Sequence, residues 1–162
     1  MGRYVEKFSS DSAFDSEKLY AVAYRLAADF KAGHEVIALL SSPKESTRAL
    51  LAKAMTIDPH CAGENLVALL STADTCTLCL CALALHRLAV PATILHGFPE
   101  AALIEQELSK GKILLLVGEQ DTALTLASTL HADACRIFEK KFSPAAVSLA
   151  QKQGVVIELC AL

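Results

Sequence analysis

The sequence predicts a single three-layer α/β sandwich with a mainly parallel sheet. Short apolar runs alternate with segments of helical periodicity along the whole chain, which is typical of strand–helix–strand units. Most of these runs, such as His34–Leu40, are almost continuously apolar, as expected for strands covered on both faces. A length of 162 residues suits one domain, residues 1–162, with its own hydrophobic core.

The first expected element is a strand at Arg3–Phe8. Ser12 and Asp15 are alternative N-caps for the helix that follows it, and Gly33 suits the position just after the last turn of that helix. His34–Leu40 is the second strand.

Two helical regions are expected between this strand and residue 88. Ser42 can cap the first region, and Glu45 can complete a capping box there. The second region opens at Asp58-Pro59, is expected to break near residues 71–74, and then resumes, so that it forms a buried pair of helices.

The remainder of the chain continues the alternation of strands and helices. The expected elements are strand Pro91–Leu95, helix Glu100–Leu108, strand Lys112–Val117, helix Asp121–Leu130, strand Ala134–Phe138, a helix from Ser143-Pro144 to Gly154, and strand Val155–Leu159.

Composition limits the partners of the protein. The net charge is −3 and acids and bases are interspersed, so neither nucleic acid nor anionic lipid is expected as a partner. The apolar content of 53% is high, which predicts that some apolar surface is buried against a second chain. We expect a homo-oligomer or a protein partner.

The compartment expected from the sequence is the cytoplasm. Arg3, Glu6 and Lys7 interrupt the segment where a secretory signal would stand. The most membrane-like stretch, Asn65–His86, holds Asp74 near its middle, so no membrane partner is expected. Six cysteines in such a chain are expected to be reduced thiols.

A phosphate-binding loop is missing from the sequence. No two of the seven glycines are close enough to share a loop, so neither a GxGxxG motif nor a P-loop is present. Acids also stand at two of the helix starts that could hold an anion, namely Asp11, Glu119 and Asp121. We expect no ATP-dependent kinase activity, no cofactor and no metal.

Several short segments resemble one enzyme family when they are taken in order. Residues 7–12, Lys-Phe-Ser-Ser-Asp-Ser, resemble the Lys-Phe-Gly-Gly-Thr-Ser opening motif of aspartate kinases, a branch of the amino acid kinase family. Residues 32–41 are similar to the second strand of the family, which ends in a serine. Residues 69–74, Leu-Leu-Ser-Thr-Ala-Asp, resemble Leu-Leu-Ser-Thr-Gly-Glu, with Asp74 at the position of a substrate-binding glutamate.

The sequence departs from the family pattern in the segments that bind the nucleotide in the family. The resemblance implies internal deletions near residues 120–121, where the family carries a Gly-Arg-Gly-Gly-Ser loop, and near residues 138–143, where it carries a Thr-Asp-Val-Asp-Gly run. We also expect no regulatory ACT domains. The resemblance therefore implies an amino-acid-kinase scaffold without its ATP-binding segments.

Four residues are candidates for a vestigial substrate site. Lys7, Ser12, Ser41 and Asp74 could form an amino-acid pocket at the carboxyl edge of the sheet, where open α/β folds bind ligands. The alternative is that Lys7 simply pairs with a nearby acid.

Three cysteines, Cys76, Cys79 and Cys81, lie together on one expected helix. The spacing of Cys76 and Cys79 suits a metal, but a tetrahedral site needs four ligands and the chain offers no second pair. Buried structural thiols are the expected interpretation, and a metal or redox role is the alternative.

Three classes of function are compatible with these features. The first is a non-catalytic module that self-associates or docks on another protein, such as a full-length aspartate kinase. The second is a sensor or carrier of aspartate or a related amino acid. The third is a residual enzyme, for which the sequence supplies no nucleophile–base pair.

Overall fold

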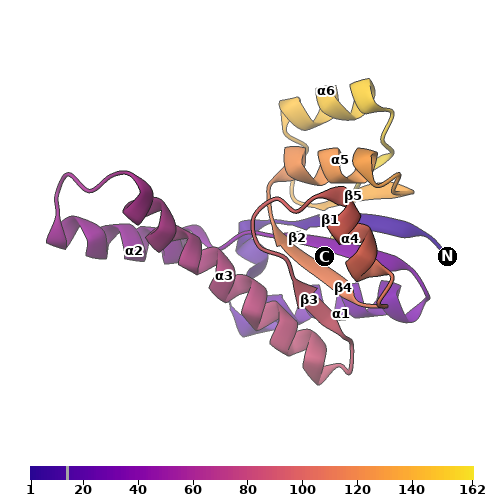
Figure 1. The fold of residues 1–162 in the computed structure, drawn as a ribbon, viewed down its shortest axis with the longest axis horizontal. Coiled ribbons are helices and arrows are strands. Elements are labelled where there is room, and N and C mark those ends of the chain that lie inside the picture. The colour runs from indigo at the N-terminus through magenta and orange to yellow at the C-terminus, as the bar shows by residue number, and fades with distance from the viewer. Residues whose placement is uncertain (14) are drawn as a thin grey trace.

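The computed structural model describes residues 1–13 and 15–162, and within them six strands form one parallel sheet (Figure 1). The order across the sheet is β3-β4-β2-β1-β5-β6. The strands are β1 (Arg3–Phe8), β2 (Glu35–Leu40), β3 (Ala92–Ile94), β4 (Ile113–Val117), β5 (Ala134–Phe138) and β6 (Ile157–Leu159).

Helices cover both faces of this sheet, so the predicted three-layer α/β sandwich is confirmed. A short 3-10 helix, η1 (Ser10–Ala13), follows β1. The α-helices are α1 (Ser16–Lys31), α2 (Lys44–Ile57), α3 (Glu64–Arg87), α4 (Ala101–Leu108), α5 (Gln120–Thr129) and α6 (Pro144–Gln153).

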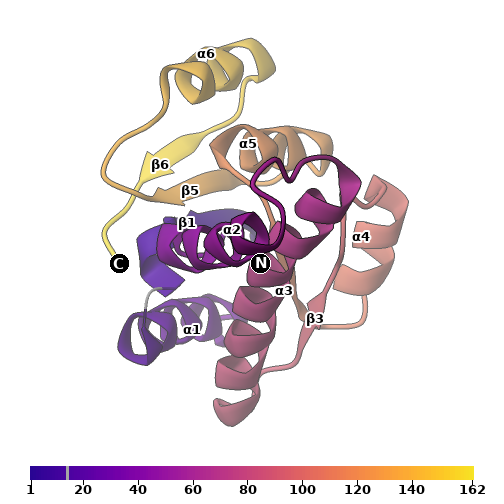
Figure 2. The same cartoon turned by 90° about the vertical axis from the view of Figure 1, so that its left-hand side faces the viewer.

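Two hydrophobic clusters, one on each face, hold the layers together. On one face, α1 and α3 pack through residues such as Leu26 and Leu85 against Phe8 and Leu115 of the sheet. On the other face, α4 and α5 pack against Val5 and Ile37, with α6 lying beyond α5 (Figure 2). The four central strands β1, β2, β4 and β5 are mostly buried, whereas the edge strands β3 and β6 are not. Burial on both faces explains the nearly continuous apolar sequences of β2 and β4.

Helix α2 and the first half of α3 form a hairpin that projects from the body of the molecule (Figure 1). None of the residues of α2 is buried, and the first buried residue of α3 is Ala73. Two of the most exposed large apolar side chains, Ile57 and Val67, lie on this hairpin at 87% and 68% exposure.

Two helices, α1 and α6, begin at expected side-chain caps. Asp15, not Ser12, is the N-cap of α1, and its carboxylate accepts a hydrogen bond from the Lys18 amide at 2.8 Å. Ser143 caps α6 by accepting a bond from the Ala146 amide, and Gly154 ends that helix in a left-handed conformation.

The expected capping box at Ser42 and Glu45 is wrong. Pro43 is the N-cap of α2 and no side chain caps this helix. The Ser42 amide donates to the Asp74 carboxylate at 2.9 Å, and the Ser42 hydroxyl lies 3.3 Å from that of Thr47. Ser42 therefore connects α2 to α3 instead of closing the first turn of α2.

The expected helix break at residues 71–74 is also wrong. Helix α3 is continuous, and the hydroxyls of Ser71 and Thr72 donate to the carbonyls of Ala68 and Leu69 within the helix. Asp58-Pro59 lies in the turn before α3 and does not open a helix. The expected buried helix pair is thus one long helix that is buried only in part.

Within the described part of the chain, α3 is the one helix long and apolar enough, by length and composition, to cross a membrane. About a fifth of its most apolar window, 22%, is buried inside the protein.

Candidate functional site

The candidate site lies at the carboxyl ends of the central strands. Lys7 is the penultimate residue of β1 and is paired in register with Leu39 of β2 and Ile137 of β5. Its side chain is fully buried, yet it ends among the turns that follow β2, β4 and β5.

Two hydrogen bonds orient the Lys7 ammonium. It donates to the Phe8 carbonyl at 2.7 Å and to the Ser41 hydroxyl at 3.0 Å. The contact brings together two residues that the sequence analysis singled out, 34 positions apart.

Two carboxylates lie next to the same ammonium. A carboxylate oxygen of Glu119, in the turn after β4, is 3.7 Å from Lys7 Nζ, and one of Glu139, after β5, is 3.8 Å away. Burial lowers the pKa of the Lys7 ammonium, and the carboxylates of Glu119, Glu139 and Asp74 oppose that shift. With three acids around one base, the site carries more negative than positive charge.

Gln120 joins the turn after β4 to the turn after β5. Its buried side-chain amide donates to Glu139 and, at 3.0 Å, to the Lys141 carbonyl, and it accepts a bond from the Ser143 amide at 2.8 Å. One side chain thus fixes two turns that lie about 20 residues apart in the sequence and positions the Glu139 carboxylate toward Lys7.

Asp74 and Ser12 lie at the margin of this site. Asp74 projects from α3 and is engaged by the Ser42 amide, and its charge acts on Lys7 over a longer distance. Ser12 is buried in η1, where its hydroxyl lies 3.1 Å from that of Ser9. Both serines line an open cavity of about 520 Å³ beside Glu139.

The start of α5 lies beside Lys7, and it is acidic. Glu119 is the N-cap and Asp121 lies in the first turn. Carboxylates here stabilise the positive end of the helix dipole themselves, so an added phosphate would meet repulsion instead of attraction.

A second group of buried charges lies on the opposite face of β1. Glu6 is fully buried, 3.2 Å from Arg136 and 3.5 Å from Arg25, and both arginines also bind Asp29 at 2.7 Å. Burial, followed by the influence of Asp29, raises the pKa of Glu6 to about 8. This network joins β1, β5 and α1 on the sheet face opposite Lys7.

The cysteines differ from the expected buried cluster. Cys76 and Cys79 are exposed on α3, which is a correction, whereas Cys81 is buried and its burial raises the pKa of the thiol to about 12. The helix presents Cys76 and Cys79 outward because its buried face is set by Ala73, Thr77 and Cys81. Among residues 1–13 and 15–162, no group of three or more His, Cys, Asp and Glu side chains could hold a metal ion.

Sequence reasoning named Glu119 as an acid at a helix start, but it did not predict that Glu119, Glu139 and Gln120 complete the site around Lys7. Glu119 and Glu139 stand directly after strands, which is a usable signal, but only the strand order brings both to Lys7. Gln120 gives no sequence signal beyond its position after Glu119.

The chain is similar in sequence to aspartokinases, although no model of a known protein family matches it. It is 26% identical over 172 positions to aspartokinase 2 of Bacillus subtilis, a match that covers 85% of this chain and 42% of the relative. Aspartate kinase of Pseudomonas fluorescens is 26% identical over 193 positions, covering 94% of this chain and 47% of the relative. The chain thus spans less than half of the length of these relatives.

Solved structures show the same fold. Aspartate kinase from Synechocystis superposes on 98% of this chain with a TM-score of 0.85 at 22% identity, and the match covers 37% of that protein. Uridylate kinase from Archaeoglobus fulgidus gives a TM-score of 0.76 at 11% identity over 91% of its length.

These likenesses define the class of protein. The parallel sheet between helices is the fold that this aspartate kinase and this uridylate kinase share. Within that fold, the sequence similarities identify the chain as an aspartate-kinase-like protein, as the motifs at residues 7–12 and 69–74 predicted.

Proposed function

We propose that this chain is a non-catalytic, aspartate-kinase-like protein that acts in the cytoplasm as an interaction, assembly or regulatory module. The observation that carries the proposal is the pairing of Lys7, at the carboxyl ends of the strands, with neighbouring carboxylates. Lys7 is held by Ser41 and faces the carboxylates of Glu119 and Glu139 within 4 Å, so its charge is already balanced. A nucleotide polyphosphate would have to displace these acids.

The bonds of Gln120 support the same proposal. The resemblance to aspartate kinases implies deletions of phosphate-binding segments near residues 120–121 and 138–143. Gln120 joins these two turns directly through Glu139, Lys141 and Ser143. The two turns therefore close against each other. This supports a compact scaffold that lacks the phosphate-binding segments of the family.

The projecting hairpin supports an interaction role. A helix such as α2, with no buried residue, gains little stability from its own chain, because most helical stability in proteins comes from packing. Its exposed apolar residues, together with those of α3, suit a partner that buries them. The partners we propose are a second copy of this chain or a full-length aspartate kinase.

Calorimetric titration with Mg-ATP tests the non-catalytic part of the proposal. We expect no binding tighter than about 1 mM, whereas an aspartokinase titrated in parallel should bind. Binding in the micromolar range by this chain would contradict the proposal.

A second candidate function is the binding of a small amino acid, and the open cavity beside Glu139 favours it. The Glu139 carboxylate, which lines this cavity and lies 3.8 Å from Lys7, would attract the ammonium group of such a ligand. If this function holds, aspartate, lysine or threonine should raise the melting temperature of the protein, and the rise should vanish in Lys7→Met. An unchanged melting temperature with all three amino acids would leave the interaction role as the better account.

A further inference from the structure

Strand β6 forms one edge of the sheet, beyond β5 (Figure 2). Its hydrogen bonds to β5 include one at 2.8 Å to the Val156 carbonyl and one at 2.9 Å from the Cys160 amide. Because the backbone groups of successive strand residues point to alternate sides, the N–H and C=O groups of Ile157 and Leu159 point away from β5. In the described part of the chain, no strand lies on that side of β6.

This edge has few of the features that keep an exposed strand from pairing. Soluble proteins protect edge strands with lysine, proline, bulges or a covering helix. The segment Val155–Cys160 holds a single charged residue, and Val156 and Leu159 are 58% and 48% exposed. The strand at the other edge, β3, follows Pro91, is half-buried at all three residues and packs on α3. Strand β6 is therefore the more open edge of the sheet.

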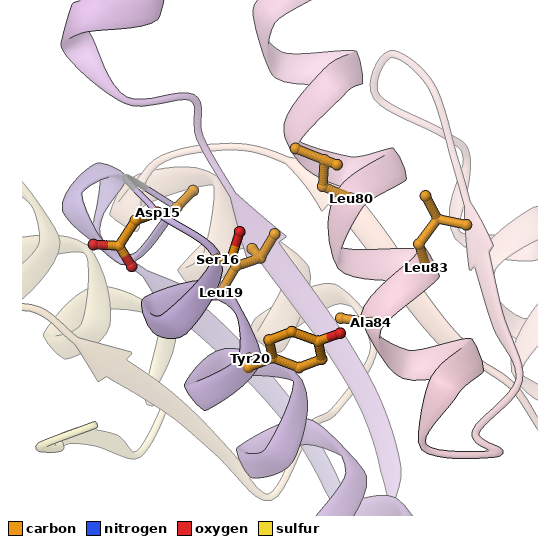
Figure 3. Close-up of a pocket in the computed structure, with 8 residues that line it drawn as sticks. Asp15, Ser16, Leu19, Tyr20, Leu80, Leu83 and Ala84 are labelled. Carbon is orange, nitrogen blue, oxygen red and sulfur yellow. The ribbon is translucent and has the colours of Figure 1, made fainter.

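The face of β6 that carries Val156 and Glu158 is also left uncovered. The helices on this face are α1 and α3, and a cavity of about 330 Å³ between them is lined by Leu19 and Leu80 (Figure 3). These helices pack on β2, β3 and β4, whereas Val156 and Glu158 remain exposed. A side chain of a neighbouring strand could therefore reach Glu158 from the open edge.

A row of alternating charges crosses the sheet on this face and ends at the same edge. Glu6 of β1, Arg136 of β5 and Glu158 of β6 are paired in register. Carboxylate oxygens of Glu6 and Glu158 lie 3.2 Å and 3.1 Å from nitrogens of the Arg136 guanidinium. Glu6 is fully buried, whereas the Glu158 side chain is 47% exposed. Because opposite charges on adjacent strands stabilise a sheet, the side chain that would continue this row is a base.

The other face of β6 suits apolar neighbours. Ile157 packs against the core cluster beneath α5, and Leu159 is exposed on the same face. A strand that covers both residues needs an apolar residue on either side of its base, since successive side chains point to opposite faces. The pattern that fits the edge is therefore apolar–basic–apolar.

We propose that β6 binds an extended segment of a partner protein, with the pattern apolar–basic–apolar, as an added strand of the sheet. The inference rests on the interaction role proposed above and names the chemistry of the partner. A second copy paired through its own β6 does not fit, because residues 155–162 contain no lysine or arginine to place opposite Glu158.

Antiparallel addition would use all four free backbone groups of β6. Ile157 and Leu159 would form hydrogen-bonded pairs with the two apolar residues of the partner. Glu158 would form the intervening pair without hydrogen bonds, in which Cα atoms are about 4.5 Å apart and side chains are closest. The base of the partner would then lie beside the Glu158 carboxylate.

Titration of isotope-labelled protein with short peptides, followed by NMR, tests this site. The peptide acetyl-Thr-Val-Arg-Val-Thr-amide should shift the amide resonances of Ile157 and Leu159. The same peptide with glutamate in place of arginine should bind about threefold more weakly or worse. In Glu158→Lys, an exposed change, the preference between the two peptides should reverse.

A change of the backbone gives a second test. Leu159→Pro removes an N–H group at the open edge without removing a bond to β5, which edge strands tolerate. We expect it to weaken binding of the arginine peptide at least tenfold. Leu159→Val keeps the N–H group and is the matched control, so its affinity should stay close to that of the wild type. If Leu159→Pro does not fold, the reversal in Glu158→Lys still decides.

The outcomes separate this inference from the proposed function. No binding at millimolar peptide, or the same peptide preference in the wild type and Glu158→Lys, would overturn the β6 site. Shifts of Ile157 and Leu159 that follow protein concentration instead of peptide would assign the edge to a second copy and would also overturn it. Tight binding of Mg-ATP would instead overturn the non-catalytic role and would leave the β6 site standing.

Discussion

Two neighbouring side chains of β1, Glu6 and Lys7, are fully buried and point to opposite faces of the sheet. Each is matched by opposite charges: Glu6 by Arg25 and Arg136, Lys7 by Glu119 and Glu139. The matching is incomplete at Glu6, because one of its carboxylate oxygens is buried without a hydrogen-bond partner among the described residues. The central strand is therefore sensitive to the protonation of a single carboxyl group.

A pH-dependent stability is expected from Glu6. Its folded pKa of about 8 lies above its ordinary value of 4.5, so between these values the folded state binds a proton that the unfolded state releases. Stability from this group is therefore complete below pH 4.5 and is lost as the pH rises toward 8, with a slope of at most about 1.4 kcal/mol per pH unit.

Replacing Glu6 by Gln should remove this contribution. Urea unfolding between pH 5 and 8 measures it: we expect the free energy of unfolding of Glu6→Gln to change less with pH than that of the wild type. Parallel curves for the two proteins would mean that Glu6 is ionised in the folded state and held by its arginines.

The sequence could predict only part of the candidate site. Lys7 and Ser41 were found through the family motifs and do contact each other. Glu119 and Glu139 were not predicted as partners of Lys7, because their proximity depends on β1 lying between β2 and β5 with β4 next to β2. Strand order in a parallel sheet is set by packing across the whole domain, and no local pattern encodes it.

At the scale of single elements, serine and threonine residues account for both the correct and the wrong predictions of helix boundaries. Ser143 caps α6 as predicted, since the residue after it is a proline that suits a first turn. Ser71 and Thr72 were expected to interrupt a helix, but their hydroxyls bond to carbonyls three residues earlier and leave the helix intact. The same residue types thus start helices or lie within them.

The cap of α6 gives a measurable contribution to stability. We expect Ser143→Ala to lower the free energy of unfolding by about 1 kcal/mol, because the Ala146 amide loses its acceptor. Ser148→Ala is the control, since Ser148 lies exposed within the same helix and alanine suits that position. Equal effects of the two changes in urea unfolding would argue against a role of the cap.

For the whole molecule, the fold class was predictable and the shape was not. Buried apolar strands alternating with capped helices were sufficient to predict a parallel three-layer sandwich. The projection of α2 and α3 was not predicted, because the apolar residues of Asn65–His86 suggested burial inside one chain. A high apolar content predicts that apolar surface is buried, but it does not show whether that surface is buried within the same chain or against a second chain.

Dimerisation should couple stability to protein concentration. Folded dimers dissociate as they unfold, so the melting temperature should fall by about 2 °C for each tenfold dilution of a dimer of this size. Differential scanning calorimetry over a hundredfold range measures this slope. A flat wild-type profile would mean that the chain unfolds as a monomer.

The central position of β1 has a consequence for how the protein is made. This strand pairs with β2 soon after synthesis, but its other neighbour is β5, and the Glu6–Arg136 contact joins residues 130 positions apart. During translation, one edge of β1 therefore stays unpaired until β5 has left the ribosome. A nascent chain stalled before β5 would expose an open edge of β1, and Glu6 and Lys7 would each lack one of their partners, Arg136 and Glu139.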